Sequence, residues 1–266
     1  MLSFDPRQAV GFVAEAAELA LRLHGQARVE TKPDHTLVTE ADRRIEDMLK
    51  ARLNSIAPEY AFLGEETGLT GSPDAPCWVI DPIDGTTNFV RGLPIWCVSV
   101  GAVYEGRCIF GAIAVPPLAE LYWAEEGQGA WLETAEAEPR RLRVTDELPL
   151  MQEDLVSCNT TVEEIVDFTG VPCRLRNFGA IAYHFAAMAG GSFAAALAHH
   201  HKLYDIAGGM CICQEAGCEV HYLDRSPWQA VVHSEKEQMP LLVAPPRRAA
   251  YFLEQLKLKE GFVSRW

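Results

Sequence analysis

Two aspartates with a glycine directly after them carry the clearest chemical signal in the chain. Asp81 and Asp84 follow a short apolar run and are separated by only two residues. Two carboxylates this close repel each other unless a proton or a cation lies between them. Mg²⁺ takes oxygen ligands and keeps open positions for water and phosphate. Gly85 permits a tight turn, and the backbone N–H groups that follow it, at the start of a short helix at Thr86, are placed to hold an anion. An isolated pair of this kind is also common in ordinary turns.

Further carboxylates lie at two distant points of the sequence. Glu65 and Glu66 follow another short apolar run, and Asp205 lies at the start of a segment rich in small residues that predicts a helix. Taken alone, the glutamates would indicate a solvated loop. Asp205 alone would be an ordinary residue at a helix N-terminus, where the dipole stabilises a carboxylate by about 0.3–1 kcal/mol.

The elements that must position these residues alternate along the chain. Amphipathic or small-residue patterns predict helices over 6–27, after Thr39 as N-cap, and over 161–169, 180–189, 203–217 and 247–258. Strand-like runs are 60–63, 77–80, 95–104, 107–115, 120–124, 129–132, 155–158, 173–176, 193–198, 219–223 and 230–233. We expect a hairpin turn at 105–106 and an acidic connection around 133–139. This interleaving predicts an α/β or α+β protein built in layers.

The composition excludes several classes of partner. The 266 residues contain 37 Asp and Glu against 23 Lys and Arg, a net charge of −14, which argues against nucleic acid and anionic membranes as partners. The first ten residues lack the order of a signal peptide. The uncharged stretch 177–198 predicts a buried helix, a turn and a buried strand rather than a membrane span. Eight scattered cysteines without a disulfide-like framework fit a cytoplasmic location.

Three segments together resemble the inositol monophosphatase family of metal-dependent, lithium-sensitive phosphatases. They are Gly-Glu-Glu at 64–66, Asp-Pro-Ile-Asp-Gly-Thr-Thr-Asn-Phe at 81–89 and Tyr-Asp-Ile-Ala-Gly at 204–208. Weaker agreement extends over most of the chain, at 37–42, 92–94, 120–124 and 127–130. The resemblance implies an α+β fold, a layered αβαβα sandwich of the sugar phosphatase type. We expect one unit over 1–266, with sub-lobes of approximately 1–145 for the metal and phosphate motif and 146–266 for the substrate side.

The resemblance also implies a set of metal ligands. Glu65, Asp81 and the carbonyl of Ile83 would hold a first Mg²⁺. Asp81 would bridge to a second Mg²⁺ that Asp84 and Asp205 also hold. A third, more weakly bound ion would lie on the Glu65 side. Mn²⁺ is expected to substitute for Mg²⁺, and Li⁺ is expected to inhibit phosphate hydrolysis.

The catalytic roles follow from the same resemblance. Thr86, with Asp42 behind it, would orient an attacking water. The first metal, on the side of Glu65, would activate this water. No phosphorylated enzyme intermediate is expected. The substrate phosphate would contact Asp84, Gly85, Thr86 and Asp205. The implied activity is that of a Mg²⁺-dependent phosphomonoesterase for a small polyol or sugar-like phosphate, inositol monophosphate first.

Three positions depart from the family pattern and leave the substrate open. Ala198 stands where inositol-processing members have an acidic residue, Ala180 where a Ser or Thr opens the middle helix, and Tyr204 where Trp is usual. Thr87 stands where the bisphosphate nucleotidase branch carries Lys, which favours the inositol- or histidinol-phosphate side. Histidinol phosphatase, fructose-1,6-bisphosphatase and 3'(2'),5'-bisphosphate nucleotidase remain alternatives. A non-catalytic regulatory member is also considered, although the retained acidic residues disfavour it. The resemblance further implies a homodimer.

Two other motifs have more than one interpretation. The run His199-His200-His201 just before Lys202 is interpreted as a polar loop in preference to a transition-metal site. A third interpretation is a cationic lip that contacts a second anionic group. The cysteines at 211, 213 and 218 lack the CxxC spacing of a zinc site and are predicted to be small core residues.

Overall fold

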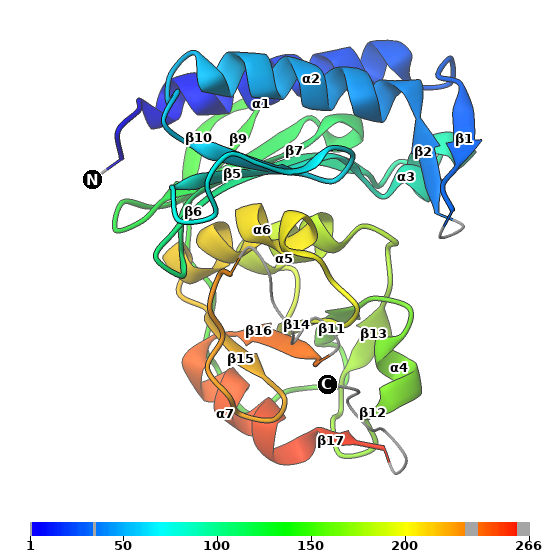
Figure 1. Ribbon diagram of the computed structural model, residues 1–266. Helices are drawn as coiled ribbons and strands as arrows, with labels where there is room; N and C mark the ends of the chain where they lie inside the picture. Colours follow the sequence, from blue (N-terminus) through cyan, green and yellow to red (C-terminus); the bar gives the residue numbers. More distant parts are fainter. Residues whose placement is uncertain (1, 34–35, 232–238, 260–266) are drawn as a thin grey trace.

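The computed structural model describes residues 2–33, 36–231 and 239–259. They form the predicted five layers, in which helical layers alternate with two sheets (Figure 1). The outer layer consists of α1 (Pro6–Leu23) and α2 (Glu40–Asn54), which pack on the larger sheet. The central layer consists of α5 (Ile181–Ala189) and α6 (Leu203–Glu215), and the far layer is α7 (Pro246–Gln255). Two shorter helices are α3 (Thr86–Arg91) and α4 (Val162–Ile165), and a single 3₁₀ turn spans Pro116–Leu118.

The larger sheet has eight strands in the order β10-β9-β8-β7-β6-β5-β3-β4. Their bounds are β3 (Ala61–Gly64), β4 (Gly68–Thr70), β5 (Cys77–Asp84), β6 (Cys97–Tyr104), β7 (Arg107–Val115), β8 (Glu120–Glu125), β9 (Gly129–Thr134) and β10 (Ala137–Leu142). β3 and β5 are parallel, whereas β5 to β10 are each antiparallel to the next strand in the sheet. The carboxyl ends of β3 and β5 therefore lie at the same edge.

The smaller sheet has the order β13-β11-β14-β16-β15. Its strands are β11 (Leu155–Cys158), β13 (Arg174–Arg176), β14 (Ala195–Ala198), β15 (Glu219–Tyr222) and β16 (Leu241–Ala244). β11 runs parallel to both β13 and β14, so the loops that follow these three strands meet at one edge. Two short ribbons complete the chain, β1 (Val29–Thr31) with β2 (Leu37–Thr39) and β12 (Val166–Asp167) with β17 (Lys257–Leu258).

Local sequence explains where the two outer helices begin. Asp5 caps α1 and Pro6 occupies its first position, where a missing N–H costs nothing. Thr39 caps α2 as predicted, since its hydroxyl accepts from the backbone of Asp42 while Asp42 accepts from the Thr39 backbone. The capping box fixes the Asp42 side chain at the start of α2, close to the carboxyl ends of β3 and β5.

Helix α6 packs unusually close to the larger sheet because both surfaces are lined by glycine. A Cβ at Gly101 on β6 would lie 2.8 Å from the Ala207 Cβ, and a Cβ at Gly111 on β7 would lie 2.2 Å from the Gly208 oxygen. A Cβ at Gly208 itself would meet the Val100 oxygen at 2.9 Å. Only glycine at these positions allows α6 to lie directly against the sheet.

Three predictions about the elements are wrong. The expected connection at 133–139 is instead the end of β9, a two-residue turn and the first half of β10. β10 is an exposed edge strand with a register shift, and Pro139 can be accommodated there because an outer edge needs no N–H partner. The expected helix at 161–169 is only α4, because Val166 pairs with Leu258 as part of β12. β16, a buried apolar strand, was not predicted.

Three other expectations concern a strand at 230–233, a membrane span and the cysteines. The predicted strand at 230–233 reaches residues outside the described ranges, and within them Ala230 forms an isolated bridge with Gly106. None of the helices in the described ranges has the length and apolar character that a bilayer crossing requires. The cysteines at 211, 213 and 218 are buried, free thiols.

Candidate active site

Asp81 and Asp84 lie at the end of β5, where the strand pairs irregularly with β6. Asp81 is opposite Ser99 and Asp84 is opposite Cys97, so three steps along β5 match two along β6. In a regular strand, residues three apart would point to opposite faces. The bulge removes this alternation. Burial, together with repulsion from Glu65 and Asp84, raises the pKa of Asp81 well above its usual range.

One oxygen of Asp81 has no hydrogen-bond partner in the described part of the chain. Asp81 is 2% exposed, and its Oδ1 atom is among the buried side-chain atoms without a partner. A buried polar atom of this kind requires an explanation, because desolvation without a compensating partner is costly. A divalent cation among these carboxylates would compensate both the lost hydration and the repulsion, so the donor set fits the metal that the sequence predicts.

Gly85 forms a turn in which any residue with a side chain would be strained. Its φ is +84°, and a Cβ would lie 3.1 Å from the Ala180 Cβ and 3.3 Å from the Ile95 oxygen. The turn leads into α3, whose first residue, Thr86, donates its hydroxyl to the Ile83 carbonyl at 3.0 Å. The motif therefore lies directly against the start of the central helix α5.

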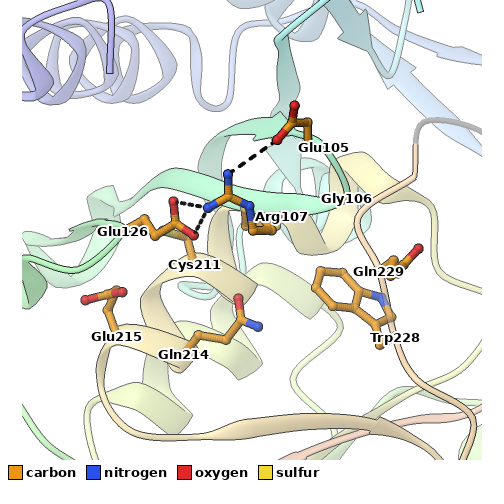
Figure 2. Close-up of a pocket in the computed structure, with 10 residues that line it drawn as sticks. Glu105, Gly106, Arg107, Glu126, Cys211, Gln214, Glu215, Trp228 and Gln229 are labelled. Atoms are coloured by element: carbon orange, nitrogen blue, oxygen red, sulfur yellow. Dashed lines mark hydrogen bonds and ion pairs between the residues drawn. The ribbon is translucent and has the colours of Figure 1, made fainter. Parts of the chain in front are cut away.

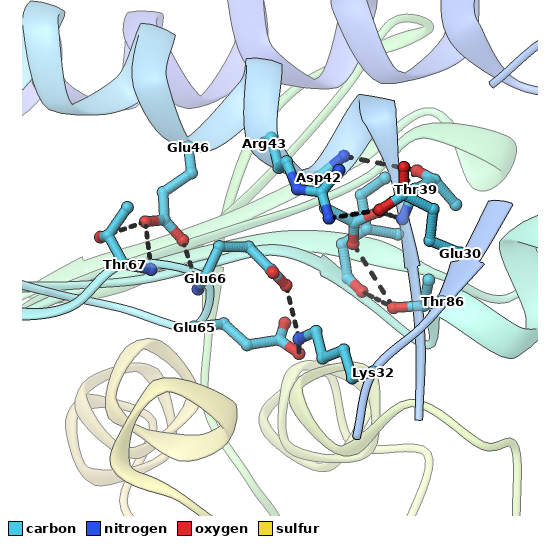
Figure 3. Close-up of polar contacts among 11 residues, drawn as sticks. Glu30, Lys32, Thr39, Asp42, Arg43, Glu46, Glu65, Glu66, Thr67 and Thr86 are labelled. Carbon is cyan, nitrogen blue, oxygen red and sulfur yellow. Dashed lines mark hydrogen bonds and ion pairs between the residues drawn. The ribbon is translucent and has the colours of Figure 1, made fainter. Parts of the chain in front are cut away.

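Thr86 also faces Asp42, as predicted (Figure 3). The Thr86 Oγ1 lies 3.5 Å from the Asp42 Oδ1. The other Asp42 oxygen accepts from the Thr39 N–H at 2.8 Å and the Thr39 hydroxyl at 2.5 Å. Because one oxygen is held by the capping box, the second remains directed at Thr86.

Glu65 and Glu66 follow β3 and reach the same edge as Asp81. The Glu65 N–H donates to the Ile80 oxygen at 3.1 Å. Asp42, Glu65 and Glu66 each offer one carboxylate oxygen, and these three oxygens lie within 4.8 Å of one another. This spacing could hold a metal ion. Burial raises the pKa of Glu65 to about 7, against the opposing hydrogen bond from Lys32.

Lys32 is a site residue that the sequence did not reveal. Its Nζ lies 2.9 Å from the Glu65 Oε1 and 2.6 Å from the Glu66 Oε1, and the lysine side chain is 20% exposed (Figure 3). Burial lowers the pKa of Lys32, but hydrogen bonds to Glu66 and Glu65 outweigh it and raise the pKa above its ordinary value. In the sequence Lys32 is one basic residue in a polar turn, with no signal that it reaches carboxylates more than thirty positions away.

Glu46 is a second residue that only the structure reveals. It is fully buried on α2 and accepts hydrogen bonds from the Glu66 N–H at 2.9 Å and the Thr67 N–H at 3.1 Å (Figure 3). A Cβ at Gly64 would overlap this carboxylate. Glu46 lies one helical turn after Asp42, on the same face of α2, which is the only sequence signal that could have indicated it.

Asp205 comes from the other half of the chain. It occupies the first turn of α6 and accepts from the Lys202 N–H at 2.6 Å. Burial raises the pKa of Asp205, and the charges of Asp84 and Glu65 raise it further. Asp205 therefore lies with the carboxylates of the larger sheet, as predicted, because α6 packs against β6 and β7.

Asp84 is held by the start of α5. Its carboxylate accepts from the Ile181 N–H at 3.1 Å and the Ala182 N–H at 2.6 Å. Burial raises the pKa of Asp84 to about 6, although these N–H groups act against the shift. Ala180 and Ala198, two of the positions that depart from the family pattern, are each 1% exposed and present no polar side chain.

A cavity lies apart from the carboxylate cluster. A space of about 400 Å³ opens at the far end of α6 from Asp205, where Arg107 is paired with Glu126 at 2.7 Å beside Gln214 and Trp228 (Figure 2). None of the predicted site residues lines it. The carboxylate cluster and this cavity are separate features.

Comparisons with known proteins agree with the fold and show the family. A profile described as the inositol monophosphatase family matches residues 6–251. A histidinol-phosphatase from Mycobacterium tuberculosis is 31% identical over 204 residues, 74% of this chain and 78% of that protein. An inositol-1-monophosphatase from Mesorhizobium japonicum is 31% identical over 208 residues, 74% of this chain and 76% of that protein. The structure of a Thermotoga maritima IMPase matches with a TM-score of 0.79 at 25% identity, covering 92% of this chain and 94% of that one. The chain therefore belongs to the inositol monophosphatase family of phosphomonoester hydrolases.

Proposed function

We propose that the protein is a Mg²⁺-dependent phosphomonoesterase that hydrolyses a small polyol or sugar-like phosphate, with inositol monophosphate as the first substrate to test. The observation that carries the proposal is the Asp81 carboxylate, which is buried, has an oxygen without a hydrogen-bond partner among the described residues, and lies with other carboxylates. When it is ionised, such a group requires a compensating charge.

Two ion positions account for the arrangement of donors. Glu65, Asp81 and the Ile83 carbonyl would hold one divalent ion. Asp81, Asp84 and Asp205 would hold a second. When bound, such ions neutralise the phosphoryl oxygens and stabilise the leaving oxygen, which is most of what phosphoryl transfer requires.

Thr86 and Asp42 would orient the attacking water. The Thr86 hydroxyl has one proton, directed at the Ile83 carbonyl or at Asp42, and its lone pairs are available to accept from a water molecule. The water oxygen forms a bond to phosphorus while the bond to the ester oxygen breaks, and the released alkoxide takes up a proton to leave as an alcohol. Asp42, buried and held by Thr39, is positioned to receive the proton of the water through Thr86.

The phosphate itself would lie over the turn at the end of β5. The resemblance places it on the backbone N–H groups of Gly85 and Thr86, with Asp84 and Asp205 beside it. The turn supports this position because no side chain at Gly85 fills the space between β5 and α5. The remaining part of the substrate would then face the loops of the smaller sheet.

Substrate identity is open within this class. The relatives described above are named for histidinol phosphate and for inositol phosphate, and fructose 1,6-bisphosphate and bisphosphate nucleotides are further candidates. The buried methyl group of Ala198 cannot accept hydrogen bonds from inositol hydroxyls, and a site that discriminates through hydroxyl groups needs such acceptors.

One panel of assays tests the proposal. Phosphate release is measured from inositol monophosphate, histidinol phosphate, fructose 1,6-bisphosphate and adenosine 3',5'-bisphosphate, with Mg²⁺ and after removal of divalent ions with EDTA. We expect release from at least one compound, only with Mg²⁺, and inhibition by Li⁺. Asp81→Asn should abolish it, whereas Asp47→Asn, an exposed aspartate on α2, should not. Release that is unaffected by EDTA, or no release from any compound, would contradict the proposal.

A further inference from the structure

The turn that carries Glu65 and Glu66 is short and lies at one edge of the larger sheet. It joins β3 to β4, and the pairing of Gly64 with Gly68 leaves three residues between the two strands. β4 is the outermost strand at this edge and has β3 as its neighbour. Strand pairing therefore supports the turn from one side, and the position of Glu65 depends on what else contacts it.

Helix α2 supplies a second support through one buried carboxylate. The Glu46 Oε2 accepts from the Glu66 N–H at 2.9 Å, and the Glu46 Oε1 accepts from the Thr67 N–H at 3.1 Å (Figure 3). The Thr67 hydroxyl donates to the same Oε1. Consecutive backbone N–H groups that converge on an anion form a favourable binding site for it. Because the two N–H groups follow Glu65 directly, Glu46 fixes the backbone beside this proposed ligand.

The space around Glu46 is fitted to this contact. The Glu46 side chain is 0% exposed, and its Oε1 lies 3.3 Å from the Lys50 Nζ, which offsets part of the cost of burying the charge. A Cβ at Gly64 would lie 2.2 Å from the Glu46 Oε1, closer than a real Cβ can approach. A glycine immediately before Glu65 therefore leaves the room that the Glu46 carboxylate occupies.

The interactions of Glu46 are separate from those that a metal ion would replace. Lys32 pairs with Glu65 and Glu66, whereas Lys50 pairs with Glu46. The carboxylate oxygens of the described residues that are spaced to hold a metal ion belong to other side chains. Binding of an ion beside Glu65 would thus displace Lys32 and leave the hydrogen bonds of Glu46 in place.

We infer that Glu46 is a positioning residue for Glu65, because it holds the turn in the position from which Glu65 binds the first divalent ion. The inference rests on the proposed function and adds a residue to its site. Glutamine at this position would keep the shape of the side chain but has one accepting oxygen where the carboxylate has two. If that oxygen replaces Oε1, the amide NH₂ faces the Glu66 N–H, and two donors oppose each other. The turn must then shift beside Glu65.

Metal affinity tests this role with Mn²⁺ as the probe. In titration calorimetry, Glu46→Gln should raise a Kd for Mn²⁺ about tenfold, and the Mg²⁺ concentration for half-maximal phosphate release should rise similarly. The kcat at saturating Mg²⁺ should stay close to that of the unaltered protein, because every ligand of the ion is retained. A purely structural role would instead lower kcat and leave the activation curve in place. Asp47→Asn, at the next and exposed position of α2, should change neither quantity.

A second variant disturbs the same contact from the opposite side. Gly64→Ala places a methyl group against the Glu46 carboxylate and should also weaken Mn²⁺ binding. In a Glu46→Ala background the overlap is absent, so Gly64→Ala should cause no further loss there. An unchanged Mn²⁺ affinity in either folded variant, or a lower kcat with an unchanged Mg²⁺ activation curve, would overturn the inference and leave the proposed function intact. An unaltered protein that neither binds Mn²⁺ nor releases phosphate would contradict the proposed function itself.

Discussion

The carboxylate of Asp84 accepts a 2.6 Å hydrogen bond from the backbone N–H of Ala182, ninety-eight positions further along the chain. This contact caps α5, whose N-cap residue, Ala180, has no side chain that could do so. A single aspartate of the metal motif thus fixes the helix that separates the two sheets. Replacing it should affect both ion binding and the position of α5.

Asp84→Asn should abolish Mg²⁺-dependent phosphate release and leave the protein folded. The amide oxygen of asparagine can still accept from the start of α5, but the negative charge that an ion needs is lost. We expect kcat/KM to fall at least about 100-fold, measured as free phosphate, with an unchanged circular dichroism spectrum. Asp47→Asn provides the control, and near-normal turnover in Asp84→Asn would reject the metal assignment.

Asp205→Ala should shift the Mg²⁺ activation curve to higher concentrations. One carboxylate of the proposed second ion position disappears, whereas Glu65 and Asp81 remain. The concentration of Mg²⁺ that gives half-maximal phosphate release should rise about tenfold or more. An activation curve that coincides with that of the unaltered protein would show that Asp205 holds no ion.

Lys32→Met should tighten the binding of a divalent cation beside Glu65 and Glu66. In the structure the ammonium already pairs with both carboxylates, so a metal ion must displace it. Methionine keeps the length of the side chain but not its charge. Titration calorimetry with Mn²⁺ should give a Kd roughly fivefold lower, equivalent to about 1 kcal/mol.

Lys257→Met is the matched control for this measurement, because it removes an exposed lysine far along the chain from the carboxylates. Binding that becomes weaker in Lys32→Met would mean that the lysine assists the ion rather than competing with it.

Glu65 should destabilise the ion-free protein as pH rises. Burial raises its pKa from 4.5 to about 7, so the folded state binds the proton more tightly than the unfolded chain does. The free energy of unfolding should therefore fall between about pH 4.5 and pH 7 through this group. His184 and His201, whose pKa values are lowered by burial, act in the opposite direction.

A comparison of melting temperatures isolates the contribution of Glu65 to the pH dependence of stability. In EDTA, the Tm of Glu65→Gln minus that of the unaltered protein should increase from pH 4.5 to pH 7.5, because glutamine does not ionise. Saturating Mg²⁺ should reverse the sign of this difference at pH 7.5. A difference that does not change with pH would show that burial does not disfavour the ionised form of Glu65.

Much of the local structure could be predicted from the sequence. The N-cap at Thr39 and the hairpin after Tyr104 depend on neighbouring residues, and both occur as expected. The strand predicted to end at Ile80 instead continues through Asp81 to Asp84, because both aspartates pair with β6. The prediction failed where pairing between distant segments decides the outcome. Val166 leaves a helical pattern to pair with Leu258, and the acidic stretch after β9 becomes an edge strand.

The site itself shows the same division. The motif around Asp81 indicated the chemistry because its residue types and spacing are specific to it. Lys32 and Glu46 could not be assigned from sequence, since their partners lie at distant positions and only the packed structure brings them together. Asp205 reaches the cluster because glycines on α6, β6 and β7 let the helix approach the sheet closely. Short-range patterns thus determined which groups could react, and long-range packing decided which of them meet.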